Sequence, residues 1–137
     1  MRSDKSKRGR AMNMYLNPKK SDFKEILTSK IYVDKTELLA YTNSVLCTSQ
    51  KYICVSCPDG FGKSITAGML TSYYRKGENS DYLFNNLKIS KNPLYKQHLN
   101  HYNVIALNIR DFLGENTIKV LIEQAVIEDL IKNSDIL

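Results

Sequence analysis

The sequence lacks any apolar run near the roughly 20 residues that a membrane-spanning helix needs. Its first ten residues are basic, and they are not followed by the apolar stretch of a secretory signal peptide. These two absences argue against membrane insertion and against secretion, so we expect a cytoplasmic protein. The composition, with 42% hydrophobic and 25% charged residues, is typical of a globular chain.

Cysteine is scarce, with three residues at Cys47, Cys54 and Cys57. An odd count without a secretion signal indicates reduced thiols rather than disulfides. Cys54 and Cys57 have the C-x-x-C spacing of a redox pair or of half a zinc site, but zinc needs two further ligands at suitable spacing. His98 and His101, three residues apart, also have no third ligand nearby. We therefore predict no redox or metal site at these cysteines and interpret the histidines as a surface pair.

Acidic residues are few at the start of the chain. Residues 1–30 contain nine Lys/Arg and three Asp/Glu, whereas the rest contains eleven of each sign. The net charge of +6 therefore comes from the N-terminal segment. We expect residues 1–20 to be a basic, disordered tail. Such a tail can contact nucleic acid, but a solvated extension is the more common role of a charge run, and we favour it.

Two short, mostly apolar runs of β-prone residues, 51–56 and 104–109, are typical of buried parallel strands. Asp34, followed three residues later by Glu37, can satisfy free amides at a helix start. Helical patterns cover residues 21–27, 35–43, 63–76 and 116–132. The alternation of strands and helices predicts an α/β fold, a parallel sheet with flanking helices of the P-loop NTPase type.

The turn between the first predicted strand and its helix reads Cys57-Pro-Asp-Gly-Phe-Gly-Lys-Ser64. A phosphate group needs several converging donors, which a tight loop at a helix N-terminus supplies through backbone amides. Gly60 and Gly62 allow the backbone to turn and to approach closely. We therefore predict a phosphate-binding loop. Its expected nucleotide ligands are Pro58, Asp59, Gly60, Phe61, Gly62, Lys63, Ser64 and Ile65.

Two side chains of this loop have expected roles. Lys63 would reach the β- and γ-phosphates of ATP as a mobile positive charge, and the Ser64 hydroxyl would bind Mg²⁺. The usual pattern is G-x-x-x-x-G-K-[ST], and Cys57 stands where its first glycine belongs. The preceding apolar run and the following amphipathic helix are the context that this motif requires.

The sequence resembles the N-terminal part of the AAA-ATPase-like family, predicted ATPases related to AAA+ proteins. Phe23–Leu27 followed by Tyr32–Leu39 is similar to the family's opening with Tyr-Val-Asp-Lys-Thr, and Ser56–Leu70 resembles its Arg-Pro-Arg-Arg-Phe-Gly-Lys-Ser loop. Tyr102–Phe112 is similar to its second core strand. The resemblance makes residues 21–137 the N-terminal part of an AAA-ATPase-like domain. It also implies ATP hydrolysis as the ancestral activity, often with a PD-(D/E)XK nuclease-like region following.

The chain departs from the family loop at Cys57, Asp59 and Gly60, which replace arginines. Loss of this positive charge should weaken nucleotide binding. Since AAA-type proteins often place adenine contacts upstream of the loop strand, Tyr32 or Phe23 could border the base, although packing is the commoner fate of aromatic residues.

Catalysis needs a Walker B acid and a water-activating carboxylate beyond the loop. In the run 104–109, Asn108 stands where the acid would be, and Asp111 is better explained as a turn residue. We therefore expect the chain to be truncated before the Walker B strand, and assign no catalytic residue. A homo-oligomer or a missing C-terminal part would complete the domain. The alternatives are a non-catalytic remnant with weak or no nucleotide binding, and a nucleic-acid module that uses the tail.

Overall fold

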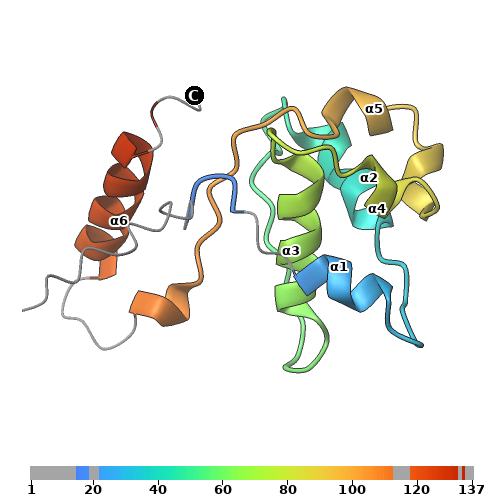
Figure 1. The fold of residues 1–137 in the computed structure, drawn as a ribbon, viewed down its shortest axis with the longest axis horizontal. Helices are drawn as coiled ribbons and strands as arrows, with labels where there is room; N and C mark the ends of the chain where they lie inside the picture. Colours follow the sequence, from blue (N-terminus) through green and yellow to red (C-terminus); the bar gives the residue numbers. More distant parts are fainter. Residues whose placement is uncertain (1–14, 19–21, 113–117, 133, 135–137) are drawn as a thin grey trace, which may run out of the picture.

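A computed structural model of the chain describes residues 15–18, 22–112, 118–132 and 134. Most of the predicted tail, residues 1–14 and 19–20, lies outside this description. Figure 1 shows a helical molecule. Its α-helices are α1 (Asp22–Leu27), α2 (Glu37–Val45), α3 (Lys63–Tyr74), α4 (Asp81–Phe84), α5 (Tyr95–His98) and α6 (Ile118–Lys132), and its 3₁₀ helices are η1 (Lys88–Lys91) and η2 (Ile109–Phe112). Among the described residues, no helix is long and apolar enough to cross a membrane.

The predicted parallel sheet is wrong, since the described residues contain no strand. Residues 51–56 are exposed, with Tyr52 at 86%. The one backbone hydrogen bond described for this run joins the Lys51 amide to the Thr48 carbonyl, at 3.4 Å. A β-prone run forms a strand only where a neighbouring backbone pairs with it, and no described segment pairs with this one.

The second predicted strand, 104–109, pairs with a different partner from the one expected. The Asn17 amide donates to the Val104 carbonyl and the Ala106 amide to the Tyr15 carbonyl, at 2.6 and 2.9 Å. These bonds form one isolated antiparallel bridge, Leu16 with Ile105. The contact with residues 15–17 therefore replaces the parallel contact with residues 51–56 on which the predicted sheet depended.

The predicted helices are present. Helices α1, α2, α3 and α6 begin and end within about two residues of the predicted ranges, a difference that is normal for helix ends. Asp34 lies before α2 as expected, and its carboxylate accepts a hydrogen bond of 2.8 Å from the Thr36 amide. Helix-forming patterns are confirmed because their backbone bonds are local and need no distant partner.

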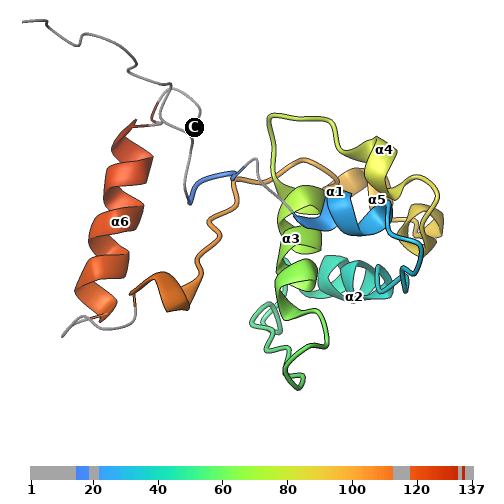
Figure 2. The ribbon, with the colours of Figure 1, turned by 60° about the horizontal axis from the view of Figure 1, so that its bottom comes forward.

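An aromatic core holds α3 against α1 and α4. The Phe23 and Phe84 rings stack with their centres 5.1 Å apart, and Tyr73 meets Phe84 edge to face at 5.3 Å. All three side chains are fully buried. Figure 2 shows α1 and α2 on the same side of α3, and both helices pack against it.

Polar bonds to two tyrosine hydroxyls join α2 to α3. The Asn43 side-chain amide donates to the Tyr73 hydroxyl at 2.9 Å, and its oxygen accepts from Tyr74 at 2.7 Å. The Tyr73 hydroxyl donates in turn to the Tyr95 carbonyl at 2.8 Å. Both tyrosines are buried, so these bonds lie inside the helical cluster.

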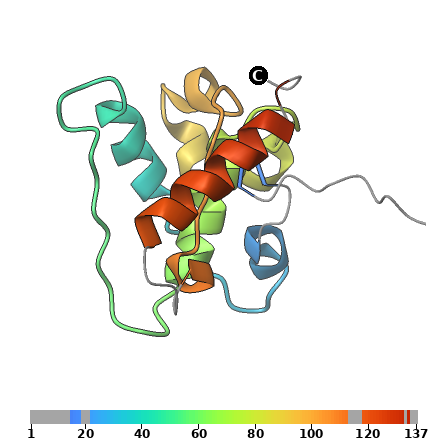
Figure 3. The ribbon, with the colours of Figure 1, turned by 90° about the vertical axis from the view of Figure 1, so that its left-hand side faces the viewer.

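Helix α6 stands apart from the cluster of α1 to α5 (Figures 1 and 2), and in Figure 3 it lies in front of that cluster. Its buried Asp129 carboxylate accepts hydrogen bonds from the amides of Tyr15 and Leu16. Its apolar residues Val120, Ile127 and Ile131 are exposed. Attachment of α6 therefore depends on segment 15–17 rather than on a sheet.

We expect Phe84→Ala to lower the free energy of unfolding by about 3–5 kcal/mol, because it removes a buried ring between two others. Urea unfolding followed by circular dichroism measures this. Tyr82→Ala in the same helix is the matched control, since Tyr82 is 60% exposed and should cost less than about 1 kcal/mol. Equal losses in the two variants would contradict this placement of the core.

Candidate functional site

The predicted phosphate loop, 57–64, joins the extended run to the N-terminus of α3. Gly60 and Gly62 have φ of +80° and +84°, in the left-handed region that side chains disfavour. The Phe61 amide donates to the Pro58 carbonyl at 3.3 Å, and the Gly62 carbonyl accepts the bond of 2.9 Å from Thr66 that begins the helix. The loop thus turns sharply twice at its glycines before the 12-residue helix.

Lys63 is bound to its own loop. Its ammonium donates to the Cys57 carbonyl at 3.2 Å and to the Asp59 carboxylate at 3.0 Å. The Lys63 and Asp59 side chains are 49% and 93% exposed, so this ion pair is in water and contributes little to stability. The same exposure leaves the lysine able to exchange Asp59 for another anion.

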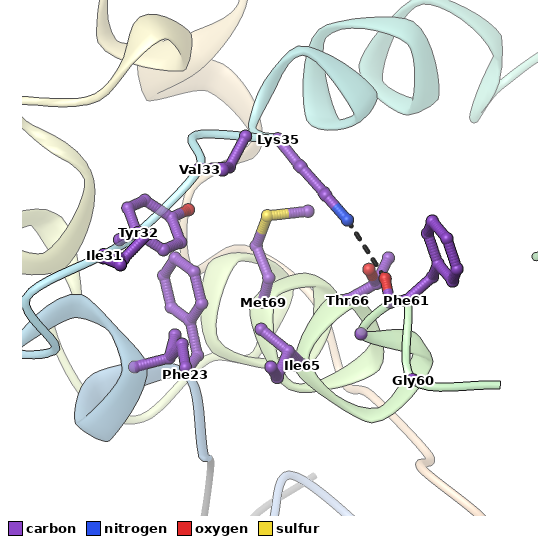
Figure 4. Close-up of a pocket in the computed structure, with 12 residues that line it drawn as sticks. Phe23, Ile31, Tyr32, Val33, Lys35, Gly60, Phe61, Ile65, Thr66 and Met69 are labelled. Carbon is purple, nitrogen blue, oxygen red and sulfur yellow. Dashed lines mark hydrogen bonds between the residues drawn. The ribbon is translucent and has the colours of Figure 1, made fainter.

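A pocket of about 360 Å³ adjoins the loop (Figure 4). Its walls come from α1, segment 31–35, the loop and α3, and they are mostly apolar. The apolar residues are Phe23, Ile26, Ile31, Tyr32, Val33, Phe61, Ile65 and Met69, and the other lining residues are Lys35, Gly60, Gly62 and Thr66. The pocket therefore has an apolar body and a polar end at the loop.

The predicted site residues divide into two groups. Gly60, Phe61, Gly62 and Ile65 line the pocket, together with both suggested adenine neighbours, Phe23 and Tyr32. The remaining predicted residues, Pro58, Asp59, Lys63 and Ser64, belong to the loop and to the start of α3 but not to the pocket wall.

Tyr32 places a polar atom in this wall. Burial raises the pKa of its phenol, and the neighbouring negative charge of Asp34 raises this pKa further. Within the described residues its buried hydroxyl makes no hydrogen bond of normal geometry, although the Lys35 amide lies near enough to lower its pKa slightly. Tyr32 is thus an uncharged aromatic residue at neutral pH.

Lys35 is the charged residue among the lining residues that the sequence did not predict; the others are Ile26, Ile31, Val33, Thr66 and Met69. Its ammonium donates to the Phe61 carbonyl at 3.0 Å, and Figure 4 shows the side chain reaching across to the loop. A Cβ atom added at Gly62 would lie 3.9 Å from this ammonium. In the sequence, Lys35 lies between Asp34 and Thr36, two residue types that often cap helices. A single sequence does not show in which direction the lysine side chain points.

The neighbours of Lys35 are fixed on the opposite side. The Asp34 carboxylate accepts bonds of 2.8, 2.6 and 2.8 Å from the Thr36 amide, the Thr36 hydroxyl and the Lys88 amide. The Thr36 hydroxyl accepts a bond of 3.1 Å from the Ile89 amide. Burial alone would raise the pKa of Asp34, but the bonds from Thr36 and Lys88 outweigh it and lower this pKa.

A family model described as Predicted AAA-ATPase matches residues 20–134, a range that contains both the loop and the pocket. The chain belongs to this family. The match confirms the family that was predicted from the 32–39 segment and from the loop of this AAA-ATPase-like chain. The match does not show the nuclease-like region that often follows in this family. No curated protein and no solved structure matches the chain.

The cysteines and histidines of this family member lie outside the pocket wall. Cys54 is exposed and Cys57 is half-buried, each as a free thiol. His98 is buried rather than on the surface as expected, and its Nδ1 lies 2.6 Å from the Tyr102 hydroxyl. In the part of the chain that the structure describes, no group of three His, Cys, Asp or Glu could hold a metal ion.

The hydrogen bonds to Asp34 predict a pH-dependent contribution to stability. Because the folded pKa lies below the unfolded one, this contribution is present above the unfolded value and disappears as pH falls through the folded value. We expect Asp34→Asn to destabilise the protein by about 1 kcal/mol at pH 7. This difference should shrink in urea titrations as the pH falls below about 4, the ordinary pKa of an aspartate, and through the lower folded pKa. Asp111→Asn, at an exposed residue, is the control. A constant difference across this range would contradict the assignment.

Proposed function

We propose that this chain binds ATP, with its phosphates at loop 57–64 and its base in the adjoining pocket. The observation that supports this most is the junction of a left-handed two-glycine loop, at the start of a long helix, with an apolar pocket. A nucleotide has the matching chemistry, with a flat apolar base at one end and concentrated negative charge at the other. The pocket volume of about 360 Å³ is within the usual range for small-ligand sites.

The base would lie against Phe23 and Tyr32 on one side and against Ile65 and Met69 of α3 on the other. Aromatic rings stack well on a purine, and the aliphatic side chains exclude water. This arrangement supports the suggestion that Phe23 or Tyr32 borders the adenine.

The phosphates would lie along Pro58–Ile65. The glycine conformations bring the main chain close to an anion, and the first amides of α3 add donors with a favourable helix dipole. In this proposal Lys63 moves from Asp59 to the β- and γ-phosphates, and Ser64 supplies a hydroxyl to Mg²⁺. Bound Mg²⁺ would neutralise phosphate charge, and the protein would orient the nucleotide.

The proposed activity is binding, and we assign no base for hydrolysis. No Asp or Glu among the described residues lines the pocket. Asn108, at the position that a Walker B acid would take in the run 104–109, donates a hydrogen bond of 3.3 Å from its side chain to Asp111. The Lys63–Asp59 ion pair favours one alternative, a remnant whose lysine no longer meets a nucleotide, and the following experiments separate the two.

We expect Lys63→Ala to weaken ATP binding about tenfold or more, because the alanine cannot replace a charge-assisted bond to phosphate. Titration of a fluorescent ATP analogue with Mg²⁺ measures the change. Lys91→Ala removes an exposed lysine of η1 and is the control that should bind as the wild type does. If the wild-type chain itself leaves the analogue unbound, the remnant is the correct interpretation.

We expect Asp59→Asn to strengthen ATP binding by about three- to tenfold, because it removes both a competitor for Lys63 and a negative charge beside the phosphates. The same titration at low and at high salt measures this, and the gain should shrink as salt screens the charge. Glu128→Gln on α6 changes the net charge equally and should leave the affinity unchanged. Weaker binding by Asp59→Asn would show that Asp59 supports the loop instead of competing.

A further inference from the structure

The charged side chain in the pocket wall is Lys35, which comes from outside the predicted loop. Figure 4 shows it extending from segment 31–35 toward the loop, where its ammonium bonds the Phe61 carbonyl at 3.0 Å. It thus stands at the polar end of the pocket, opposite the apolar residues of α1 and α3. A ligand that extends from the apolar body of the pocket to the loop must contact this ammonium.

The position of Lys35 is fixed by its two neighbours. Asp34 and Thr36 are bonded to each other and to the Lys88 and Ile89 amides, and Thr36 is fully buried. Because residues 34 and 36 both turn toward η1, the side chain between them points the other way, to the loop. The hydrogen bonds of Asp34 and Thr36 therefore fix the backbone that carries Lys35.

The two lysines near the loop differ in their charge partners. Lys63 forms an ion pair with Asp59, whereas within the described ranges Lys35 forms none and has only the neutral Phe61 carbonyl. A carbonyl is a weaker partner for an ammonium than a phosphate oxygen is. A side chain at position 62 would place its Cβ atom 3.9 Å from the Lys35 ammonium, and Gly62 has no such atom.

We propose that Lys35 is a phosphate ligand of the bound nucleotide. On binding, its ammonium exchanges the Phe61 carbonyl for an oxygen of the phosphate that lies at the junction of pocket and loop. Asp59 partly cancels the positive charge of Lys63, and Lys35 supplies further positive charge to the phosphates. This inference rests on the proposed nucleotide binding and adds to it a second cation from outside the loop.

The test compares ATP with adenosine on Lys35→Met, a substitution that keeps the length of the side chain and removes its charge. Isothermal titration calorimetry of the full chain should show ATP affinity reduced about three- to tenfold and adenosine affinity unchanged. Lys35→Arg retains the charge and should keep ATP affinity near that of the wild type. Lys91→Met, at an exposed lysine away from the pocket wall, is the matched control and should have no effect.

Each outcome separates this inference from the proposed function. If the wild type binds ATP and Lys35→Met binds it equally well, Lys35 is no phosphate ligand and the proposed function stands. If Lys35→Met loses affinity for ATP and adenosine in parallel, the residue only supports the pocket. The same conclusion follows if Lys35→Met is unfolded by circular dichroism and Lys35→Arg also fails to bind ATP. If the wild-type chain binds neither ligand, both proposals are wrong.

Discussion

The structure depends most on the placement of Tyr73 near the end of α3. Its ring is buried against Phe84 and its hydroxyl joins Asn43 of α2 to the carbonyl of Tyr95 at the start of α5. One side chain therefore fixes α3 against three other helices. Since a helix is rigid along its length, this anchor also fixes the opposite end of α3, where the glycine loop begins.

From that anchor the pocket follows as a consequence of packing. Phe23 stacks on Phe84 and brings α1 beside α3, and Tyr32 meets Phe23 edge to face. The aromatic residues of the core thus continue into the wall of the pocket. The polar groups of the loop begin at the other end of the pocket. The same packing therefore produces both the apolar body and the polar end beside it.

Charge around the loop is divided between two lysines with different supports. Lys63 lies at the start of α3, is half-exposed and pairs with Asp59 of the same loop. Lys35 is mounted on a hydrogen-bonded tripeptide and faces the pocket. A nucleotide would have to displace an anion from the first lysine but only a neutral carbonyl from the second. The second is therefore the more readily available cation.

The sequence alone determined the helices and the glycine loop, because helix bonds join residues four apart and a left-handed turn needs glycine at one position. It also indicated the family through the 32–39 segment and the loop. Tertiary structure decided the rest. Within the part of the chain that the structure describes, no segment pairs with 51–56, and 104–109 pairs with 15–17, since strands need distant partners that the local pattern does not specify. Likewise, only packing turned Lys35 toward the loop and buried Tyr74 in the core.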